Sequence, residues 1–367
     1  MIPAVTRAGT AKLAGVVVAL AALVVFPLVF TNPSVTTIAV FTLLFMASAT
    51  AWNAFSGYSG YISLGHAAFF GTGAYILAIM AVRLGIPAGL SMFALVPVAG
   101  MGAAVVAVPF GLIALRTRRH TFVVITIAVF FTFQLLAFNL SITDGSSGIQ
   151  VPSPNWTAAT YNNPYYYVSL GIVIFATLVS WALRRSVFGL QLLAIRDDED
   201  RARGLGVPVG RVKLIAFVLS AVPVGMCGAV YAYFLGQIFP QFAFNPLFDL
   251  SVALMALFGG IGTLTGPLLG ALVLESLQQY FAIQFTNDDL YLVLYGALFL
   301  LVLLWMPRGV IPTAGDLLRR LKARRAVGAA AGRAALRPSG SPHLDQPAPS
   351  TAVPGGGLVA SGPDPRS

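Results

Sequence analysis

Three ionisable side chains stand inside long apolar stretches of this sequence: His66, Asp249 and Glu275. Burying a charge in a membrane is costly, so such residues are candidates for contact with a transported substrate. Each also has a plainer interpretation. A neutral, hydrogen-bonded packing role is the stronger interpretation for His66. Asp249 fits the first turn of a helix near the outer interface, where the helix dipole favours an acid. For Glu275 both interpretations stay open.

The sequence offers no residue set for catalysis, so we expect a chain that is not an enzyme. No Gly-Lys-Ser/Thr nucleotide loop occurs, and the three histidines and one cysteine lack metal-ligand spacing. We therefore expect no metal site and no cofactor bound by this chain. No series of acids crosses the apolar segments, which disfavours a proton-driven carrier. The net charge of +10 is explained by membrane topology, so no nucleic-acid partner is expected.

The densest charge lies in "AIRDDEDRARGLGV", residues 194–207, where seven of the eight positions 196–203 are charged. Asp197 and Asp198 favour a helix start, and Asp197–Arg201 and Glu199–Arg203 have i,i+4 spacing. Glycines and Pro208 then end the pattern. The spacing predicts one short helix, 197–205, outside the hydrocarbon. Its residues and flanks are Arg196, Asp197, Asp198, Glu199, Asp200, Arg201, Ala202, Arg203, Gly204, Leu205 and Gly206.

A short rigid helix on the membrane surface suits docking into a groove of a partner protein. We expect a small buried contact with that partner at Ala202 and Leu205, with the charges orienting the helix. The alternative is a solvated loop whose charges only set topology. Topology needs basic residues alone, whereas four acids occur here, so docking is the favoured hypothesis.

The composition sets the elements that must position these residues. Charged residues make up 9% of the chain and hydrophobic residues 57%, too few charges to cover a soluble globule of this size. Apolar blocks near 20 residues are long enough to cross a bilayer as helices. We predict an all-α polytopic membrane protein of about 10 segments (8–10). The candidate spans are 13–30, 35–56, 60–82, 87–115, 120–140, 164–183, 213–238, 248–262, 266–285 and 290–306.

The basic residues define the sidedness. With ten spans, every Lys and Arg except Arg83 falls on one side, while loops 141–163, 239–247 and 286–289 contain none. The positive-inside rule then places both termini in the cytoplasm. We expect residues 1–312 to form the transmembrane domain, with a charged loop at 184–213. Residues 313–367 form a basic tail rich in Pro, Gly and Ala, which we expect to be largely disordered and to meet anionic lipid.

Two glycine-rich stretches, 57–75 and 259–267, predict broken or re-entrant helices. Broken backbone at membrane depth needs shelter from protein or from a water-lined cavity. Their Ser/Thr-Leu pairs before Gly indicate an internal repeat, and such repeats flank transport pathways. The alternative is that small residues only permit close helix packing. The candidates for the translocation path are Ser63, Gly65, His66, Gly259, Gly260, Gly262, Thr263, Thr265, Gly266 and Glu275.

Three segments carry a family resemblance. "GYSGYISLGHAAFFGTGAYILA" (57–78), the 194–232 segment and "ALFGGIGTLTGPLLGALVLESL" (256–277) resemble, in this order, the motifs of branched-chain amino-acid ABC permeases of the LivM type. The similarity runs from about 35 to 310. The family's cytoplasmic loop usually reads Glu-Ala-Ala followed by Gly. Here Arg replaces part of the small-residue run, and coupling through Ala202 and Gly206 carries over.

The resemblance implies an ABC importer permease fold and a set of partners. These are a LivH-like permease, two ATPase subunits that bind ATP, and an extracytoplasmic binding protein. The implied substrates are branched-chain amino acids, with urea or short-chain amides as alternatives within the same class. From a different class, a stand-alone gradient-coupled carrier also fits the broken helices. Such a carrier has no evident need for the charged helix.

Overall fold

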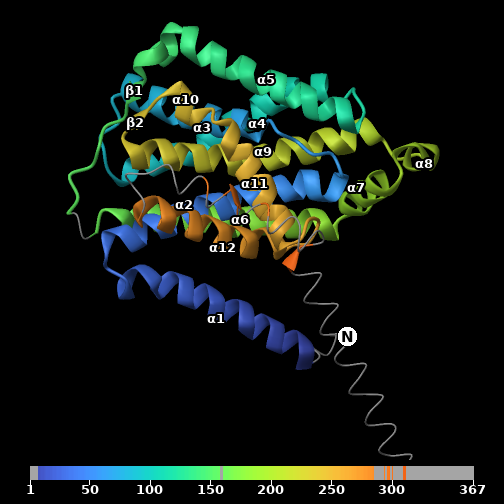
Figure 1. Ribbon diagram of the computed structural model, residues 1–367, viewed down its shortest axis with the longest axis horizontal. Helices are drawn as coiled ribbons and strands as arrows, with labels where there is room; N and C mark the ends of the chain where they lie inside the picture. The colour runs from blue at the N-terminus through green and yellow to red at the C-terminus, as the bar shows by residue number, and fades with distance from the viewer. Residues whose placement is uncertain are drawn as a thin grey trace, which may run out of the picture. The chain divides into compact units, whose positions relative to one another are not determined.

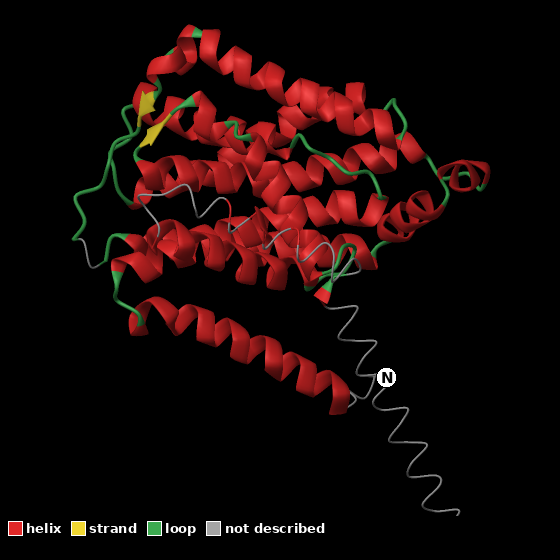
Figure 2. Cartoon of the chain, in the orientation of Figure 1, coloured by secondary structure: helices red, strands yellow, loops and turns green. Residues whose placement is uncertain are grey.

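The computed structural model describes residues 7–157 and 160–284, with isolated positions between 293 and 310. The predicted span 290–306 falls almost wholly outside the described residues, and the tail from 313 falls entirely outside them. Within the described part the chain is almost entirely helical (Figures 1 and 2). The expectation of an all-α polytopic fold is confirmed.

The helices follow the predicted apolar blocks closely. Asn32 and Asn245 cap helices that open with a proline, Pro33 and Pro246, which is a favourable helix start. The helices are α1 (Arg7–Val29), α2 (Pro33–Trp52), α3 (His66–Arg83), α4 (Leu95–Ala114), α5 (Arg119–Asn139), α6 (Asn162–Arg185), α7 (Val187–Asp197), α8 (Glu199–Gly204), α9 (Val209–Leu235), α10 (Pro240–Ala243), α11 (Pro246–Gly259) and α12 (Gly266–Gln284).

Short turns extend some of these helices. A π-helical turn, Asn53–Gly57, continues α2, and a 3-10 turn, Leu90–Ala94, leads into α4. Further 3-10 turns cover Ser141–Thr143 and Gly145–Ser147. Among the described residues, seven continuous helical segments are long and apolar enough to cross a membrane. A shorter apolar helix covers Val17–Val29. The predicted total of about ten spans is not confirmed.

Glycine contacts hold the centre of the bundle, where α9 packs against α3 and α4. A Cβ on Gly73 would lie 2.0 Å from the carbonyl oxygen of Gly225, and one on Gly228 would lie 1.9 Å from that of Phe70. The backbones of α3 and α9 therefore touch, as small residues allow in membrane bundles.

The loops without basic residues meet at one end of the bundle. Strand β1 (Ile149–Gln150) pairs antiparallel with β2 (Gln237–Ile238), and the Tyr233 hydroxyl bonds the backbone of Gly89. At the other end, Arg119 reaches the carbonyls of Ile195 and Arg196. Figure 1 shows β1 and β2 at the opposite end from α7 and α8. The predicted grouping of basic and non-basic loops is thus confirmed for these segments.

Both predicted breaks are present. Residues 58–65 lie between the π-helical turn and α3, so the third span begins at His66 and not at 60. Side chains shelter the freed backbone: Trp52 Nε1 donates to the Ser63 carbonyl (2.8 Å), and Leu64 N donates to Thr126 Oγ1 (3.2 Å). Residues 260–265 separate α11 from α12, with Gly260 and Gly262 at positive φ (122° and 76°). Sheltered breaks of this kind are the tolerated form of irregular backbone at membrane depth.

Candidate functional site

The charged segment forms two helices, which corrects the prediction of one helix over 197–205. Helix α7 starts at the Ser186 cap and ends at Asp197, and Asp198 is extended (φ −155°, ψ 109°). The Asp198 carboxylate accepts the Arg201 amide (3.0 Å) and so caps α8. Asp198 therefore has a structural role as the N-cap of α8. The chain turns between the two helices because this cap competes with helix continuation.

The ion pairs of α8 differ in part from the expected pairs. Glu199–Arg203 forms as predicted (3.0 Å), but Arg201 pairs with Asp198 (3.0 Å) and not with Asp197. Asp200 adds a second contact to Arg203 (3.2 Å). Gly204 ends α8, and Gly206 has a positive φ of 85°, as the glycine pattern predicts.

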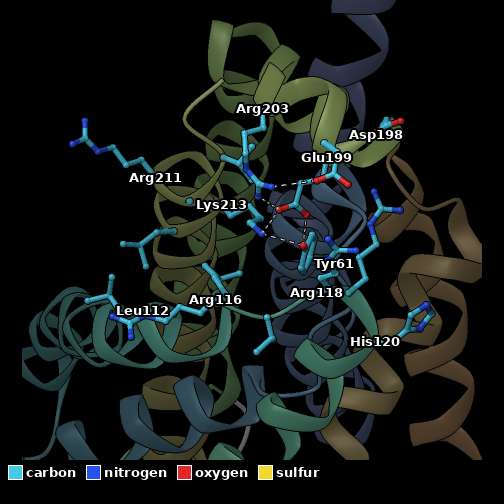
Figure 3. Close-up of a pocket in the computed structure, with 18 of the residues that line it drawn as sticks. Tyr61, Leu112, Arg116, Arg118, His120, Asp198, Glu199, Arg203, Arg211 and Lys213 are labelled. Atoms are coloured by element: carbon cyan, nitrogen blue, oxygen red, sulfur yellow. Dashed lines mark hydrogen bonds and ion pairs between the residues drawn. The ribbon is translucent and has the colours of Figure 1, made fainter. Parts of the chain in front are cut away.

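Glu199 attaches α8 to the helix bundle. Its carboxylate accepts the Tyr61 hydroxyl and, at 3.2 Å, the ammonium of Lys213 in the first turn of α9. The Lys213 ammonium also donates to the Tyr61 oxygen (3.0 Å) and lies 4.1 Å from the centre of that ring. Figure 3 shows Tyr61, Glu199, Arg203 and Lys213 facing one another. These four side chains are named here the Glu199 cluster.

The charges in this cluster compensate one another. Burial raises the pKa of Glu199, but the Tyr61 hydrogen bond and the Lys213 charge outweigh it, so the pKa lies below its ordinary value. Burial, together with the adjacent carboxylate, raises the pKa of Tyr61. Glu199 is therefore ionised and Tyr61 neutral at physiological pH. The buried lysine has its partners, as a buried cation requires.

The structure excludes Ala202 from the predicted docking contact, and the contact at Leu205 stays a prediction. Leu205 is 85% exposed and available to a partner, but Ala202 is 1% exposed and buried in the chain's own core. Ala202 sits on the inner face of α8, because Glu199 turns that face toward the bundle. The prediction that Ala202 contacts a partner is therefore wrong. Leu205, the apolar residue that follows α8, stays exposed.

An open groove of about 900 Å³ lies beside α8. Its walls come from the 116–120 segment, from the start of α9, and from the 197–200 acids with Arg203 (Figure 3). Arg116, Arg118 and Arg211 line it, and none of their side chains forms an ion pair or a hydrogen bond within the described residues. The surface around α8 is thus charged in both signs.

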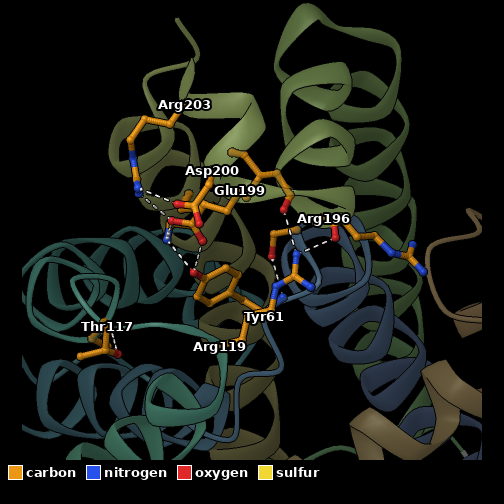
Figure 4. Close-up of polar contacts among 11 residues, drawn as sticks. Tyr61, Thr117, Arg119, Arg196, Glu199, Asp200 and Arg203 are labelled. Carbon is orange, nitrogen blue, oxygen red and sulfur yellow. Dashed lines mark hydrogen bonds and ion pairs between the residues drawn. The ribbon is translucent and has the colours of Figure 1, made fainter. Parts of the chain in front are cut away.

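Arg119 holds the C-terminal end of α7 in place. Its guanidinium donates to the carbonyls of Ile195 (2.9 Å) and Arg196 (2.5 Å), which are among the orphan acceptors at a helix C-terminus. Figure 4 shows Arg119 and Arg196 beside the Glu199 cluster. The 116–119 loop and the charged segment therefore form one continuous surface.

The two breaks are joined to each other through Asn53, in the π-helical turn. Its amide nitrogen donates to the Thr263 carbonyl (2.8 Å), and its amide oxygen accepts the Gly262 N–H (2.7 Å). Asn53 thereby satisfies two backbone groups inside the 260–265 break. Thr263 and Gly266 complete the turn through a side-chain bond (3.0 Å). Thr265 is exposed.

Close packing accounts for several candidate glycines. A Cβ on Gly259 would lie 1.7 Å from the Gly266 carbonyl oxygen, and one on Gly266 would lie 2.4 Å from that of Gly260. A Cβ on Gly65 would meet the Phe110 ring at 2.7 Å. These contacts are the packing alternative stated for the glycines, so the glycines are needed for the fold whatever else they do.

His66 has the geometry of a packed, neutral histidine. It is fully buried, its ring nitrogens bond the Ser63 and Ser220 hydroxyls (3.0 Å each), and Phe55, Phe69 and Phe217 surround it. With both nitrogens paired to uncharged groups, the ring holds helices α3 and α9 together.

The two intramembrane acids have different surroundings. Asp249 lies in the first turn of α11, as expected, but it is buried, and its Oδ1 accepts the Ala67 amide at the start of α3 (3.0 Å). It therefore caps a neighbouring helix that has no side-chain cap of its own. Glu275 is buried in α12, where Oε1 accepts from Gln279 (2.8 Å) and Oε2 has no hydrogen bond among the described residues. Its neighbour Ser276 pairs with Thr42, so Glu275 stands away from the Asn53 level.

Sequence reasoning missed Tyr61, Lys213, Arg119 and Asn53. One signal existed for Lys213, since it is a basic residue at the edge of a long apolar span. The others act through partners far along the chain, such as Tyr61 with Glu199, 138 positions apart.

A bundle of membrane-length helices, with sheltered breaks and a docked charged helix at one end, defines a transport permease. The chain belongs to the family described as "Branched-chain amino acid transport system / permease component", whose model matches residues 34–303. The predicted resemblance is confirmed. The chain is accordingly a multi-pass inner-membrane permease of the ABC transporter class and a non-enzymatic transport component.

Individual relatives agree with the family. The chain is 27% identical to the high-affinity branched-chain amino acid transport system permease protein LivM of Escherichia coli K12, over 75% of this chain and 69% of that protein. The identity to LivM of Salmonella typhimurium is 27%, over 79% and 73%. The permease protein LivH of Escherichia coli K12 is 26% identical, over 70% of this chain and 87% of LivH. No solved structure matches the chain significantly.

Proposed function

We propose that this chain is the LivM-type subunit of an ATP-driven importer for branched-chain amino acids. It pairs with a LivH-like permease, receives substrate from an extracytoplasmic binding protein, and is driven by two separate ATPase subunits. ATP binds to those subunits. Both termini and the α7–α8 segment face the cytoplasm. The names of the LivM and LivH relatives support the substrate class and the permease pairing.

The observation that carries the proposal is the attachment of α8 to the helix bundle. The Glu199 cluster fixes α8 to the bundle by its inner face, while Leu205 stands 85% exposed at its end. A short helix held rigidly with one free apolar side chain suits docking into a groove, because little conformational entropy is lost on binding. A stand-alone carrier has no use for such a helix.

The sheltered breaks at 58–65 and 260–265 are proposed to adjoin the translocation path. They join two parts of the chain that are distant in sequence, and broken helices of this kind border substrate paths in transporters. Thr265 has an exposed side chain in the 260–265 break, and Glu275, whose Oε2 has no hydrogen bond among the described residues, is a second candidate for the path farther along α12.

The test uses Leu205→Glu with Arg83→Gln as the control, because Arg83 is an exposed residue in the last turn of α3 and its change also lowers the net charge by one. Leu205→Glu buries an unpaired charge in the docking contact, so we expect the membrane-inserted chain to lose its ATPases on co-purification and to stop leucine uptake. Arg83→Gln should retain both. Normal ATPase retention and uptake by Leu205→Glu would contradict docking through α8.

Wild-type proteoliposomes separate the alternatives. An importer takes up leucine only when ATP and the ATPases are inside. Uptake driven by an ion gradient without ATP would identify a gradient-coupled carrier, and competition by urea or a short-chain amide, with none by leucine, would identify the other substrate class.

A further inference from the structure

Arg196, the next-to-last residue of α7, reaches from the charged segment to both breaks. Its Nη1 donates to the Gly57 carbonyl at the end of the π-helical turn (2.8 Å). The same nitrogen would lie 2.4 Å from a Cβ on Gly262, and the Arg196 Cγ would lie 3.0 Å from a Cβ on Gly60. Gly57, Gly60 and Gly262, named here the glycine niche, therefore leave space for one guanidinium between the two breaks.

The niche is also held together without Arg196. A Cβ on Gly57 would meet the Asn53 side chain at 2.1 Å, and Asn53 bonds both Gly262 and Thr263. Gly60 and Gly262 have positive φ values of 73° and 76°, a conformation that residues with a Cβ rarely adopt. Both the free space and the backbone conformation of the niche therefore suit the Arg196 side chain.

The α7 end of the connection is rigid as well. Arg119 bonds the Ile195 and Arg196 carbonyls, and Asp198 starts α8 two residues later. A displacement of α8 therefore moves the backbone of Arg196, and a guanidinium bonded to Gly57 carries that displacement to the breaks. The Glu199 cluster forms a parallel attachment through Tyr61, which lies in the same 58–65 segment.

We propose that Arg196 is a positioning residue that transmits movement of α7–α8 to the two membrane breaks. This inference rests on the proposed function, in which the ATPases cause the movement of α7–α8. Arg196 sets the relative position of the 57–60 and 260–265 segments, and its loss leaves ATP hydrolysis without a matching movement of the path. The planar guanidinium fits between Gly57 and Gly262 and bonds the Gly57 carbonyl through Nη1, whereas a lysine ammonium is a single point of charge.

The experiment measures leucine taken up per ATP hydrolysed in proteoliposomes of the full complex, with Arg196→Gln against wild type. We expect ATPase retention to be unchanged and the uptake-to-ATP ratio to fall about tenfold, as when one charge-assisted hydrogen bond is lost. Arg83→Gln, the same chemical change on an exposed side chain in the last turn of α3, should keep the wild-type ratio. An unchanged ratio in Arg196→Gln, or an equal fall in Arg83→Gln, would overturn the proposal.

The ratio of uptake to ATP hydrolysis distinguishes a role of Arg196 in transmission from a role in stability. A merely structural role would reduce the yield of intact complex but leave the ratio of the surviving complexes unchanged, which also overturns the proposal. If Arg196→Gln does not assemble, Arg196→Lys is judged by the same criterion: a lowered ratio supports transmission, and a wild-type ratio refutes it. Failure of the proposed function looks different, because the wild-type complex itself would then show no ATP-dependent uptake.

Discussion

Besides Arg203 in its own helix, Glu199 has two partners from other parts of the chain, Tyr61 from the 58–65 break and Lys213 from α9. One carboxylate thus joins α8, a membrane break and a long span. Because the group is partly exposed, water screens the ion pair and its contribution to stability is modest. Its importance lies in orientation: it decides that Ala202 faces inward and Leu205 outward.

The lowered pKa of Glu199 makes a pH-dependent prediction. A carboxyl whose pKa is lower in the folded state stabilises the fold above its unfolded pKa of about 4.3, and this contribution is lost as the pH falls through the folded value. Glu199→Gln should therefore lower Tm by about 2–4 °C for each kcal/mol lost, equally from pH 8 to pH 5. The difference should disappear in strongly acidic buffer.

The measurement is thermal unfolding of the purified chain in detergent at several pH values. Asp200→Asn is the control, because Asp200 is exposed and contacts only Arg203, so little change is expected at any pH. A Glu199→Gln difference that grows as the pH falls would contradict the ion-pair account.

At the scale of the element, α8 depends on its cap. Asp198→Ala removes the acceptor for the Arg201 amide, at a cost of about 1 kcal/mol. Hydrogen exchange of that amide should be roughly fivefold faster, the factor that corresponds to this energy. Asp197→Ala removes the same charge from a side chain that forms no hydrogen bond or ion pair within the described residues, so the exchange rate should stay unchanged. Equal acceleration in both variants would show a charge effect and not a cap.

The α11–α12 hairpin depends on backbone contact. Gly259→Ala would put a Cβ 1.7 Å from the Gly266 carbonyl oxygen, so the helices must separate, at about 1–3 kcal/mol for overpacking. We expect a lower Tm and reduced uptake. Gly171→Ala in α6 has open space around its Cβ and should be neutral or slightly stabilising. An unchanged Tm for Gly259→Ala would mean that the hairpin has room to relax.

Local sequence signals predicted the seven membrane-length segments of the described residues and both breaks, because apolar block length and glycine act within a few residues. They did not predict the split of 197–205 into two helices, since Asp198 could start a helix or continue one and only the structure decides. The burial of Ala202 and the capping of α3 by Asp249 also escaped prediction. Both depend on partners that the fold brings together from distant positions, and no local pattern encodes those distances.

At the scale of the molecule, the sidedness is open to direct measurement. Cys227 is the single cysteine of the chain and is fully buried, so an introduced cysteine reports without background. Asn155→Cys should react with an impermeant maleimide added outside intact cells, and Arg201→Cys should react only after the membrane is opened. Both residues are exposed. The reverse pattern would invert the proposed topology.

The β1–β2 pair limits how the bundle can open. Its two short strands follow α5 and α9, and the Ile149–Ile238 register ties the loops at the ends of these helices together. An outward movement that separated α5 from α9 would first have to break the hydrogen bonds between these two strands. A movement that opens the bundle on its non-basic side while this pair stays intact must therefore keep the ends of α5 and α9 together.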